Sequence, residues 1–382
     1  MSSPRKGSVD KDVVAASDLA DTVSSLSWSP VAEDLLAASC WDGKVYVYRT
    51  AAAGNTQQVS GLTVGEPVLA CDWTKDGNMI VAGSTDHRIH ALDLSSGQQA
   101  IIGSHTAPVR GVRSVEVPGA NFPVVASGSW DKTVKFWDLR QSNAAAAMTL
   151  DCKDRVYAFD AKAELLVAAT AELHVHLVDL KNPNQFMDTQ KSPCLYQTKA
   201  VACFPDGSGW GTASIGGHCG MSIIDKENKN HNFTFKCHRE ISRTSRDIWS
   251  VNAMAFHPQY TSTFVTAGAD GRFIFWDRAA RSHLRTYPPA PRNLNTSSEP
   301  SSSKSPFTSP STNKDQTTPP HSAITAVAFN SNGSSLAYAV GYDWSFGCAG
   351  NSPQIQTRIM MHPVLDIDAK PKQKNSLWTP SR

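Results

Sequence analysis

Short runs in which apolar and polar residues alternate recur along this chain of 382 residues. In VKFWD (134–138), Val134 and Phe136 lie on one side of a period of two, and FIFWD (273–277) repeats the arrangement. Such alternation with β-branched and aromatic residues is typical of β-strands, and Asp-Gly or Asp-Lys pairs beside the runs predict tight turns. The pattern therefore predicts an all-β chain of many short strands.

One longer unit recurs six times: small residues, a polar turn, alternating apolar residues and a closing apolar or aromatic residue. The copies are AASCWDGKVYVYR (37–49), VAGSTDHRIHALD (81–93), ASGSWDKTVKFWD (126–138), VAATAELHVHLVD (167–179), ASIGGHCGMSIID (213–225) and VTAGADGRFIFWD (265–277). The closing residues, from Tyr48 to Trp276, are 44, 45, 41, 46 and 52 positions apart. This is the WD-repeat period of about 40–45 residues, with one longer insertion.

Each unit is preceded by a further alternating strand, and there are seven such strands. They lie at 22–30, 67–73, 108–117, 155–161, 200–207, 250–258 and 323–333. Seven starts against six complete units predict a seven-bladed WD-repeat β-propeller whose last blade is completed by an N-terminal strand around residues 12–20. That closure leaves no edge of the ring unpaired. We expect the closing strand and blades one to six in residues 12–287, and blade seven in 321–365.

Three segments fall outside the predicted ring. Residues 288–320 contain 8 Pro, 8 Ser and 5 Thr. Such a segment has too little apolar surface to offset the entropy lost on ordering, so we expect a disordered loop. It is either a passive insertion or a substrate of proline-directed kinases at Ser305, Ser309 and Thr318, each followed by Pro. We also expect a flexible N-terminus at 1–11. The segment 366–382 is predicted to be a basic flexible tail, either simply solvated or in weak contact with nucleic acid.

Composition narrows the class of protein. Hydrophobic residues make up 40% of the chain, which is enough for a large core, and the net charge is +2. A nearly neutral chain does not predict general nucleic-acid binding, so such a role needs a local basic patch. The sequence predicts no membrane span and no secretory signal. Its eight cysteines form no C-x-x-C pair, so we expect free thiols in a reducing compartment and neither a metal nor another cofactor.

Histidine, serine and aspartate recur together in a way that resembles a hydrolase triad. Blade three holds His105, Ser127, Asp131 and Trp137 at positions where WD repeats form a hydrogen-bonded chain. No G-x-S-x-G elbow is present and the spacing repeats between blades, so we interpret these residues as structural. The same interpretation applies in blade six to His238, Asp270 and Trp276. With no nucleotide-binding or metalloprotease motif either, the sequence predicts a protein that is not an enzyme.

Two strings carry a family resemblance. NFTFKCHR (232–239) resembles a signature shared by two sister WD-repeat families, the nuclear-pore mRNA export factors and the mitotic-checkpoint WD-repeat proteins. DIWSVNAMAFHP (247–258) is similar to both. The resemblance implies binding of a short peptide, the GLEBS motif, which lies on a nucleoporin for the first family and on checkpoint proteins for the second.

Three further strings favour the export factors. FWDRAAR (275–281), YDWS (342–345) and DTVSSLSWSP (21–30) are similar to that family's sixth blade, last blade and first strand. The chain departs from the family pattern at FGCAG (346–350), where a Lys-Gly-His-Glu-like run is usual.

The predicted peptide contacts are Trp41, Trp130 and Arg239. Trp41 and Trp130 occupy turns on one face of the ring, where an exposed tryptophan either anchors a partner or packs on the next blade. Arg239 follows His238 in a loop between blades on that face. Its guanidinium suits a carboxylate, and the resemblance implies that the GLEBS motif is acidic at its centre.

A second predicted site is an RNA-binding rim. Its basic residues would contact phosphates and its tryptophan would stack on a base, unless the rim is merely solvated. The predicted members are Lys236, Arg239, Trp276, Arg278 and Arg281, of which Arg278 and Arg281 are expected in the connection between blades that follows the closing strand of the sixth unit.

The resemblance therefore implies a monomeric propeller in a heteromeric complex, with a GLEBS-type nucleoporin peptide and mRNA as partners. The chain would support export of polyadenylated mRNA at the nuclear pore, residing in the nucleus and at the nuclear envelope and shuttling to the cytoplasm. RNA contact is either direct or through the partner. The alternatives are a spindle-checkpoint adaptor at kinetochores and a substrate receptor of a ubiquitin ligase.

Overall fold

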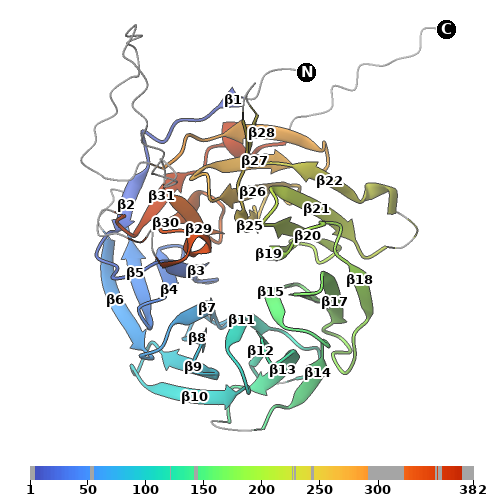
Figure 1. The fold of residues 1–382 in the computed structure, drawn as a ribbon. Coiled ribbons are helices and arrows are strands. Elements are labelled where there is room, and N and C mark those ends of the chain that lie inside the picture. Colours follow the sequence, from blue (N-terminus) through green and yellow to red (C-terminus); the bar gives the residue numbers. More distant parts are fainter. Residues whose placement is uncertain are drawn as a thin grey trace, which may run out of the picture.

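Seven sheets surround a central opening (Figure 1). The computed structural model describes residues 5–51, 56–120, 122–141, 145–225, 227, 229–241, 245–290, 322–348, 351 and 355–371. Within these ranges, helix is limited to α1 (Asp366–Ala369) and the 3-10 turns η1 (Lys229–His231) and η2 (Trp344–Phe346). None of the described helices has the length and apolar content needed to cross a bilayer. The predicted seven-bladed β-propeller is confirmed.

Each blade is built on four antiparallel strands, which follow chain order from the opening outwards except that the outermost strand of blade seven, β2, comes from the N-terminal part of the chain. Blades one to three contain β3 (Val23–Trp28), β4 (Leu35–Cys40), β5 (Lys44–Thr50) and β6 (Thr56–Thr63); β7 (Val68–Trp73), β8 (Met79–Ser84), β9 (Arg88–Asp93) and β10 (Gln99–Ser104); and β11 (Val109–Val115), β12 (Val124–Ser129), β13 (Thr133–Asp138) and β14 (Met148–Asp151).

The remaining blades follow the same plan. Blades four to seven contain β15 (Val156–Lys162), β16 (Leu165–Thr170), β17 (His174–Asp179) and β18 (Asp188–Lys191); β19 (Thr198–Cys203), β20 (Gly209–Ser214), β21 (His218–Ile223) and β22 (Phe233–Lys236); β25 (Val251–Phe256), β26 (Thr263–Gly268), β27 (Phe273–Asp277) and β28 (Ser282–Thr286); and β29 (Ala323–Phe329), β30 (Ser335–Gly341), β31 (Arg358–Pro363) and β2 (Val13–Ala16).

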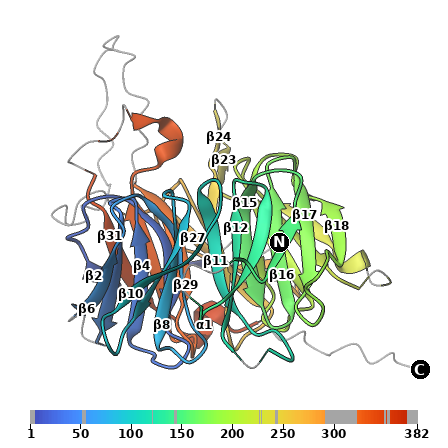
Figure 2. The same cartoon turned by 90° about the horizontal axis from the view of Figure 1, so that it is seen from below.

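The two ends of the ring differ in what they carry. We call the end with the turns between second and third strands and the connections between blades the upper face, and the opposite end the lower face. The hairpin of β23 (Arg239–Ile241) and β24 (Arg246–Ile248) projects from the upper face, and α1 lies at the lower face (Figure 2). Any residue can therefore be assigned to a face from the connection in which it lies.

The apolar core of the described residues is divided among the junctions between blades. Seven buried clusters occur, and each combines side chains of two neighbouring blades. Packing is close enough to require glycine at Gly103, where a Cβ atom would come 2.1 Å from the Trp137 ring. Each sheet therefore buries its two faces against its two neighbours.

The N-terminal strand closes the ring as the strand count predicts. β2 pairs antiparallel with β31, with Val13 opposite Met361. Just before β2, the Asp12 carboxylate accepts a hydrogen bond from the Tyr338 hydroxyl at 2.7 Å and lies 2.6 Å from Nδ1 of His362. Residues more than 300 positions apart thereby hold the seventh blade together.

The N-terminal end differs from the expected flexible segment at 1–11. β1 (Arg5–Lys6) pairs in parallel with β28, and the Gly7 amide donates to the Thr286 carbonyl at 2.8 Å. Blade six consequently has a fifth strand. Backbone pairing with an otherwise open sheet edge orders this segment, a stabilisation that its polar sequence does not reveal.

The C-terminal segment also differs from the predicted tail at 366–382. Asp368 is buried and lies 2.8 Å from the Arg285 guanidinium, and the Thr263 hydroxyl donates to the Ala369 carbonyl at 2.7 Å. These partners dock α1 on blade six. Residues 372–382 lie outside the described ranges.

Part of the predicted Pro/Ser/Thr-rich loop at 288–320 is described. Ala290 is buried, and its amide donates to the Gly271 carbonyl at 2.9 Å, so the start of this segment belongs to the fold. Residues 291–321, including the Ser-Pro and Thr-Pro sites, lie outside the described ranges.

Both predicted hydrogen-bonded chains form in the structure, each within its own blade. In blade three, His105 lies 2.8 Å from both Asp131 and Ser127, and the Trp137 indole donates to Ser127 at 2.8 Å. The geometry ties an inter-blade loop to the second and third strands, which suits a structural role.

Blade six repeats this arrangement with threonine in place of serine. His238 lies 2.8 Å from Asp270 and 3.0 Å from Thr266, and Trp276 donates to Thr266 at 2.9 Å.

Replacing Asp131 by Ala should destabilise the protein by about 1–3 kcal/mol, because it leaves the buried His105 and two backbone amides without their acceptor. The measurement is urea unfolding. The matched control is Asp151→Ala in the same blade, which removes an exposed ion pair with Lys153 that water and salt screen, so this variant should lose clearly less stability. Equal losses for the two variants would contradict the structural role.

The His238–Asp270 pair should make stability depend on pH. Burial alone would lower the pKa of His238, but Asp270 outweighs burial and raises it above the ordinary 6.5. The folded protein thus holds this proton more tightly than the unfolded chain does. The resulting contribution to the free energy of unfolding is complete below about pH 6.5 and is lost as pH rises through the raised pKa. In urea unfolding, Asp270→Asn should therefore lower the free energy of unfolding more at about pH 6 than at about pH 9.

The blade-three pair supplies the control for this experiment. Burial lowers the pKa of His105, so this residue stays neutral between about pH 7 and 9. The cost of Asp131→Asn should be constant over that range. A cost of Asp270→Asn that is the same at both pH values would refute the prediction for blade six.

Candidate functional site

An open cavity of about 430 Å³ lies at the upper mouth of the central opening. Aromatic side chains form its rim and cationic side chains lie deeper. Among its lining residues are Trp41, Trp130, Tyr157, Trp344, Arg110 and Lys199. We refer to it as the upper cavity.

The rim tryptophans are held by local turn geometry. Trp41 follows β4 in a tight turn that Gly43 completes at a φ of 84°. It is 36% exposed and stacks on Trp344, with ring centroids 6.2 Å apart. Trp344 in turn donates from its indole to the Thr22 hydroxyl at 3.2 Å. An exposed apolar surface is thus fixed in place before any partner arrives.

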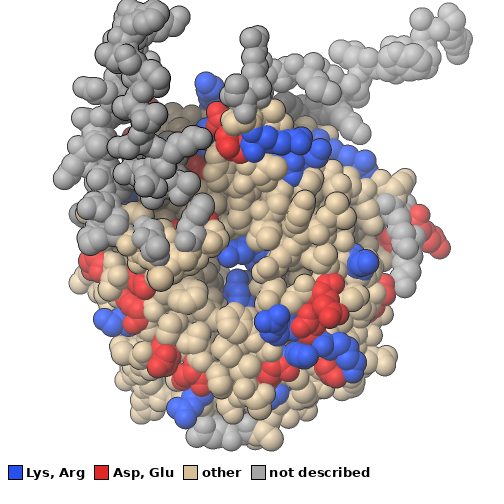
Figure 3. Space-filling model, viewed as in Figure 1, with Lys and Arg blue, Asp and Glu red and all other residues tan. Residues whose placement is uncertain are grey.

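The cations come from the starts of two innermost strands. Arg110 is the second residue of β11 and Lys199 the second residue of β19, and basic side chains are visible in the central opening (Figure 3). Burial and the neighbouring Arg113 lower the pKa of Arg110. Burial and Arg110 likewise lower the pKa of Lys199, which Asp343 partly opposes.

These cations have no direct contact with a carboxylate. Within the described ranges, neither Arg110 nor Lys199 forms an ion pair or a hydrogen bond with a carboxylate, although Asp343 lines the same cavity and acts electrostatically on Lys199. Two half-buried like charges gain from an anionic group placed between them. The upper cavity is therefore electrostatically suited to a carboxylate or phosphate.

The wall of the upper cavity also offers unsatisfied polar atoms. The indole nitrogen of Trp130, the side-chain oxygen of Asn252 and one carboxylate oxygen of Asp343 are buried and have no hydrogen-bond partner among the described residues. Buried polar groups normally find partners, so both donors and acceptors are available to a bound chain.

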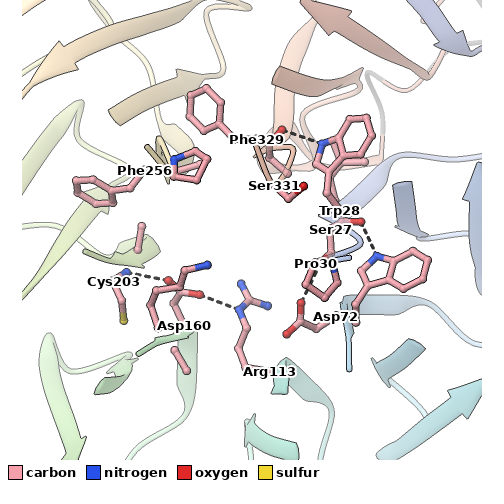
Figure 4. A pocket seen from close by; sticks show the side chains of 18 of the residues that line it. Ser27, Trp28, Pro30, Asp72, Arg113, Asp160, Cys203, Phe256, Phe329 and Ser331 are labelled. Carbon is pink, nitrogen blue, oxygen red and sulfur yellow. Dashed lines mark hydrogen bonds and ion pairs between the residues drawn. The ribbon is translucent and has the colours of Figure 1, made fainter. Parts of the chain in front are cut away.

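The lower mouth of the opening presents the opposite situation (Figure 4). Its cavity of about 460 Å³ contains charged side chains that are already paired. Arg113 lies 2.8 Å from Asp160, whose other oxygen accepts from the Cys203 amide at 2.8 Å. Asp72 accepts from the Ser114 amide and the Ser27 hydroxyl, both at 2.9 Å. We therefore interpret the lower mouth as structural.

Arg239 lies on the upper face but outside the lining of the upper cavity. Its guanidinium donates to the carbonyls of Gly217 at 3.0 Å and Gly216 at 2.6 Å, and also contacts His218 at 2.8 Å. Most of the donors that we expected to meet a partner carboxylate thus hold the turn between β20 and β21. The structure brings Trp41 and Trp130 together and places Arg239 apart from them.

Exposed apolar side chains surround Arg239 on the upper face. They belong to the connection between blades four and five, to the β20–β21 turn and to the β23–β24 hairpin. The members, with their exposed fractions, are Leu195 (82%), Tyr196 (53%), Ile215 (43%), Ile241 (66%) and Ile248 (43%). Exposed apolar side chains gathered on one face are typical of a surface that binds a protein.

The predicted RNA-binding rim does not form one surface. Lys236 ends β22 at the upper face, opposite His218 of β21. Arg278 and Arg281 instead lie in the β27–β28 turn at the lower face. The prediction put them in a connection between blades, because Trp276 was assigned to the end of a blade, whereas Trp276 is on the third strand and a fourth follows.

The lower-face arginines each cover a phenylalanine. The Arg278 guanidinium lies 3.9 Å from the ring centroid of Phe204, and that of Arg281 lies 5.0 Å from that of Phe233. Arg281 also donates to the Asn230 carbonyl at 2.6 Å. Burial lowers the pKa of Arg278, with Asp206 opposing. We call these two pairs the arginine–phenylalanine surface.

Trp276 is less available than predicted. It is half-buried, its ring centroid lies 4.7 Å from that of Phe235, and its indole donor is used by Thr266. No group of three or more potential metal ligands occurs among the described side chains.

Sequence reasoning missed Arg110, Lys199, Tyr157 and Trp344 as residues of one cavity. A signal was present, because Arg110 in PVRG and Lys199 in TKAV occupy the same register position of two innermost strands. Equivalent positions in different blades converge on the axis of the ring.

Comparison with protein families agrees with the repeat pattern. Residues 97–138 and 230–277 match the model described as WD domain, G-beta repeat. Residues 23–110 match the model of the anaphase-promoting complex subunit 4 WD40 domain.

Whole-chain similarity is more specific. The WD40 repeat protein poxJ of Penicillium oxalicum is 41% identical over 370 residues, covering 96% of this chain and 97% of that protein. The Poly(A)+ RNA export protein of Schizosaccharomyces pombe is 39% identical, covering 96% and 95%. The mRNA export factor GLE2 of Chaetomium thermophilum is 38% identical, covering 96% and 94%. The sister family is represented by the Mitotic checkpoint protein BUB3.1 of Arabidopsis thaliana, 31% identical over 93% of both chains.

Proposed function

Since the chain belongs to the WD-repeat mRNA export factor family, we propose that it is a non-enzymatic adaptor that binds an acidic, GLEBS-type nucleoporin peptide on its upper face. In this role it acts at the nuclear pore, shuttles between nucleus and cytoplasm, and supports export of polyadenylated mRNA. The observation that carries the proposal is the upper cavity, where an aromatic rim surrounds two cations that form no ion pair among the described residues.

The peptide site combines three kinds of contact. Carboxylates of the peptide pair with Arg110 and Lys199 in the upper cavity. Its apolar side chains cover Trp41, Trp344 and the exposed apolar side chains around Arg239. Its backbone satisfies the orphaned polar atoms of Trp130 and Asn252. In this proposal Arg239 orders the surface rather than pairing with the acidic centre.

The RNA contact is assigned to the arginine–phenylalanine surface of the lower face. Arg278 and Arg281 supply phosphate contacts, and the half-buried Phe233 ring beneath Arg281 supplies apolar surface for a base, whereas Phe204 beneath Arg278 is fully buried and offers none. Separate faces allow one ring to hold a nucleoporin peptide and a single-stranded RNA at the same time, which is what an adaptor requires.

A checkpoint adaptor is the second candidate, because it would use the same acidic-peptide site. Relatives named as RNA export proteins or mRNA export factors are 31–39% identical to this chain against 31% for BUB3.1, and the two at 38–39% favour the export role. No feature of the described residues favours a ubiquitin-ligase receptor or an enzyme.

Charge reversal at Lys199 should abolish tight peptide binding. Lys199→Glu should weaken binding of a synthetic GLEBS-type peptide about 30-fold or more in calorimetry, because removing one partner of a buried charge pair costs about 2–5 kcal/mol. Lys75→Glu, an exposed reversal at the lower mouth, is the control and should bind normally. Equal affinities for both variants would remove the upper cavity from the proposal.

RNA binding should depend on the lower face. Arg281→Ala should weaken binding of a single-stranded oligo(A) in fluorescence anisotropy and lower the slope of log affinity against log salt by about 0.7, the value for one lost phosphate contact. Lys236→Ala, at the opposite face, should leave both unchanged. If Lys236→Ala weakened binding and Arg281→Ala did not, the RNA site would lie on the upper face. If the unmodified protein had no measurable affinity for RNA at low salt, direct RNA binding would be refuted.

A further inference from the structure

Two cysteine side chains meet in the core between blades five and six. Cys219 lies on β21 and Cys237 directly follows β22, and their Sγ atoms are 3.5 Å apart and share a hydrogen bond. Both thiols are free and buried, at 0% and 6% exposure. Neither the peptide site nor the RNA surface uses them.

The backbone places the pair on one side of neighbouring strands. Cys219 is opposite Phe235, and the Cys237 amide donates to the Gly217 carbonyl at 3.1 Å. The two residues are therefore diagonal neighbours on the same face of the sheet. An approach of about 1.5 Å would bring the sulfurs to the bonding distance of about 2.05 Å.

The surroundings make the two thiols unequal. Burial alone would raise the pKa of Cys237, but the hydrogen bond with Cys219 and the positive charges of His238 and Arg239 lower it below its ordinary value. Burial raises the pKa of Cys219 well above its ordinary value. Cys237 is therefore the thiol of the pair that loses its proton more readily, which suits it to attack an oxidant while Cys219, 3.5 Å away, resolves the product.

We propose that Cys219 and Cys237 form a redox-modification site, at which a peroxide converts the two thiols into a disulfide. The Cys237 thiolate attacks one oxygen of hydrogen peroxide, the O–O bond breaks, and the departing hydroxide takes up a proton to become water. The resulting sulfenic acid is attacked by Cys219, an S–S bond forms as the S–O bond breaks, and the thiol proton leaves with the hydroxide as a second water. The two sulfurs together lose two electrons and the peroxide gains two.

The disulfide would tie the end of β22 to β21 beneath the β23–β24 hairpin. Gly217 and Arg239 lie at this point, because Gly217 accepts from both the Cys237 amide and the Arg239 side chain. Oxidation thus acts on the support of the upper face without using any residue that lines the upper cavity.

The test counts and maps thiols in the full chain carrying Cys348→Ser, which removes the exposed cysteine. After hydrogen peroxide, thiol titration of the unfolded protein should fall from seven free thiols to five, and dithiothreitol should restore seven. Mass spectrometry without reduction should find the Cys219 peptide linked to the Cys237 peptide. Seven remaining thiols, or a bond to Cys194, would overturn the proposal.

A single variant tests the order of the two steps. In Cys219→Ser the resolving thiol is absent, so dimedone should label a sulfenic acid at Cys237. The control is Cys71→Ser, which removes a buried cysteine of blade two and should still form the Cys219–Cys237 bond. Dimedone labelling at other cysteines, with Cys237 unlabelled, would refute the assigned nucleophile.

Discussion

Every sheet of this ring has two apolar faces, and each face can leave water only by packing on the next blade. The seven buried clusters at the seven junctions are the result. Such packing is complete only when the last blade meets the first. Closure of the ring is therefore a condition for burying every apolar sheet face. Asp12, with Tyr338 and His362, supplies that closure from opposite ends of the chain.

Closure also explains how the protein tolerates unpaired charge at its centre. The innermost strands converge on the axis, and whatever occupies the second position of β11 and β19 must face the opening. At the lower mouth, the arginine, Arg113, forms an ion pair with Asp160. At the upper mouth Arg110 and Lys199 repel each other, and the packed junctions hold them in place. The asymmetry between the two mouths is what distinguishes a binding cavity from a structural one.

The repeat pattern of the sequence was sufficient for the architecture, because alternation and turns at a fixed spacing encode blades locally. It was insufficient for the site. Trp41 and Trp130 were found because each stands in a turn, but Arg110 and Lys199 become neighbours only through the ring. Arg278 was predicted on the wrong face because its side depends on which strand of the blade precedes it. The sequence also did not reveal that Arg239 uses its donors within the protein. They bind the carbonyls of the β20–β21 turn, which belongs to another pair of strands.

The distance along the chain between Asp12 and its partners matters for how the protein is made. On a ribosome, β2 emerges more than 300 residues before β31, the strand that it pairs with. During that interval the nascent chain carries an unpaired strand and an unburied sheet face, the features that promote wrong association. Production of this ring therefore places its greatest demand on chaperones before the final blade appears.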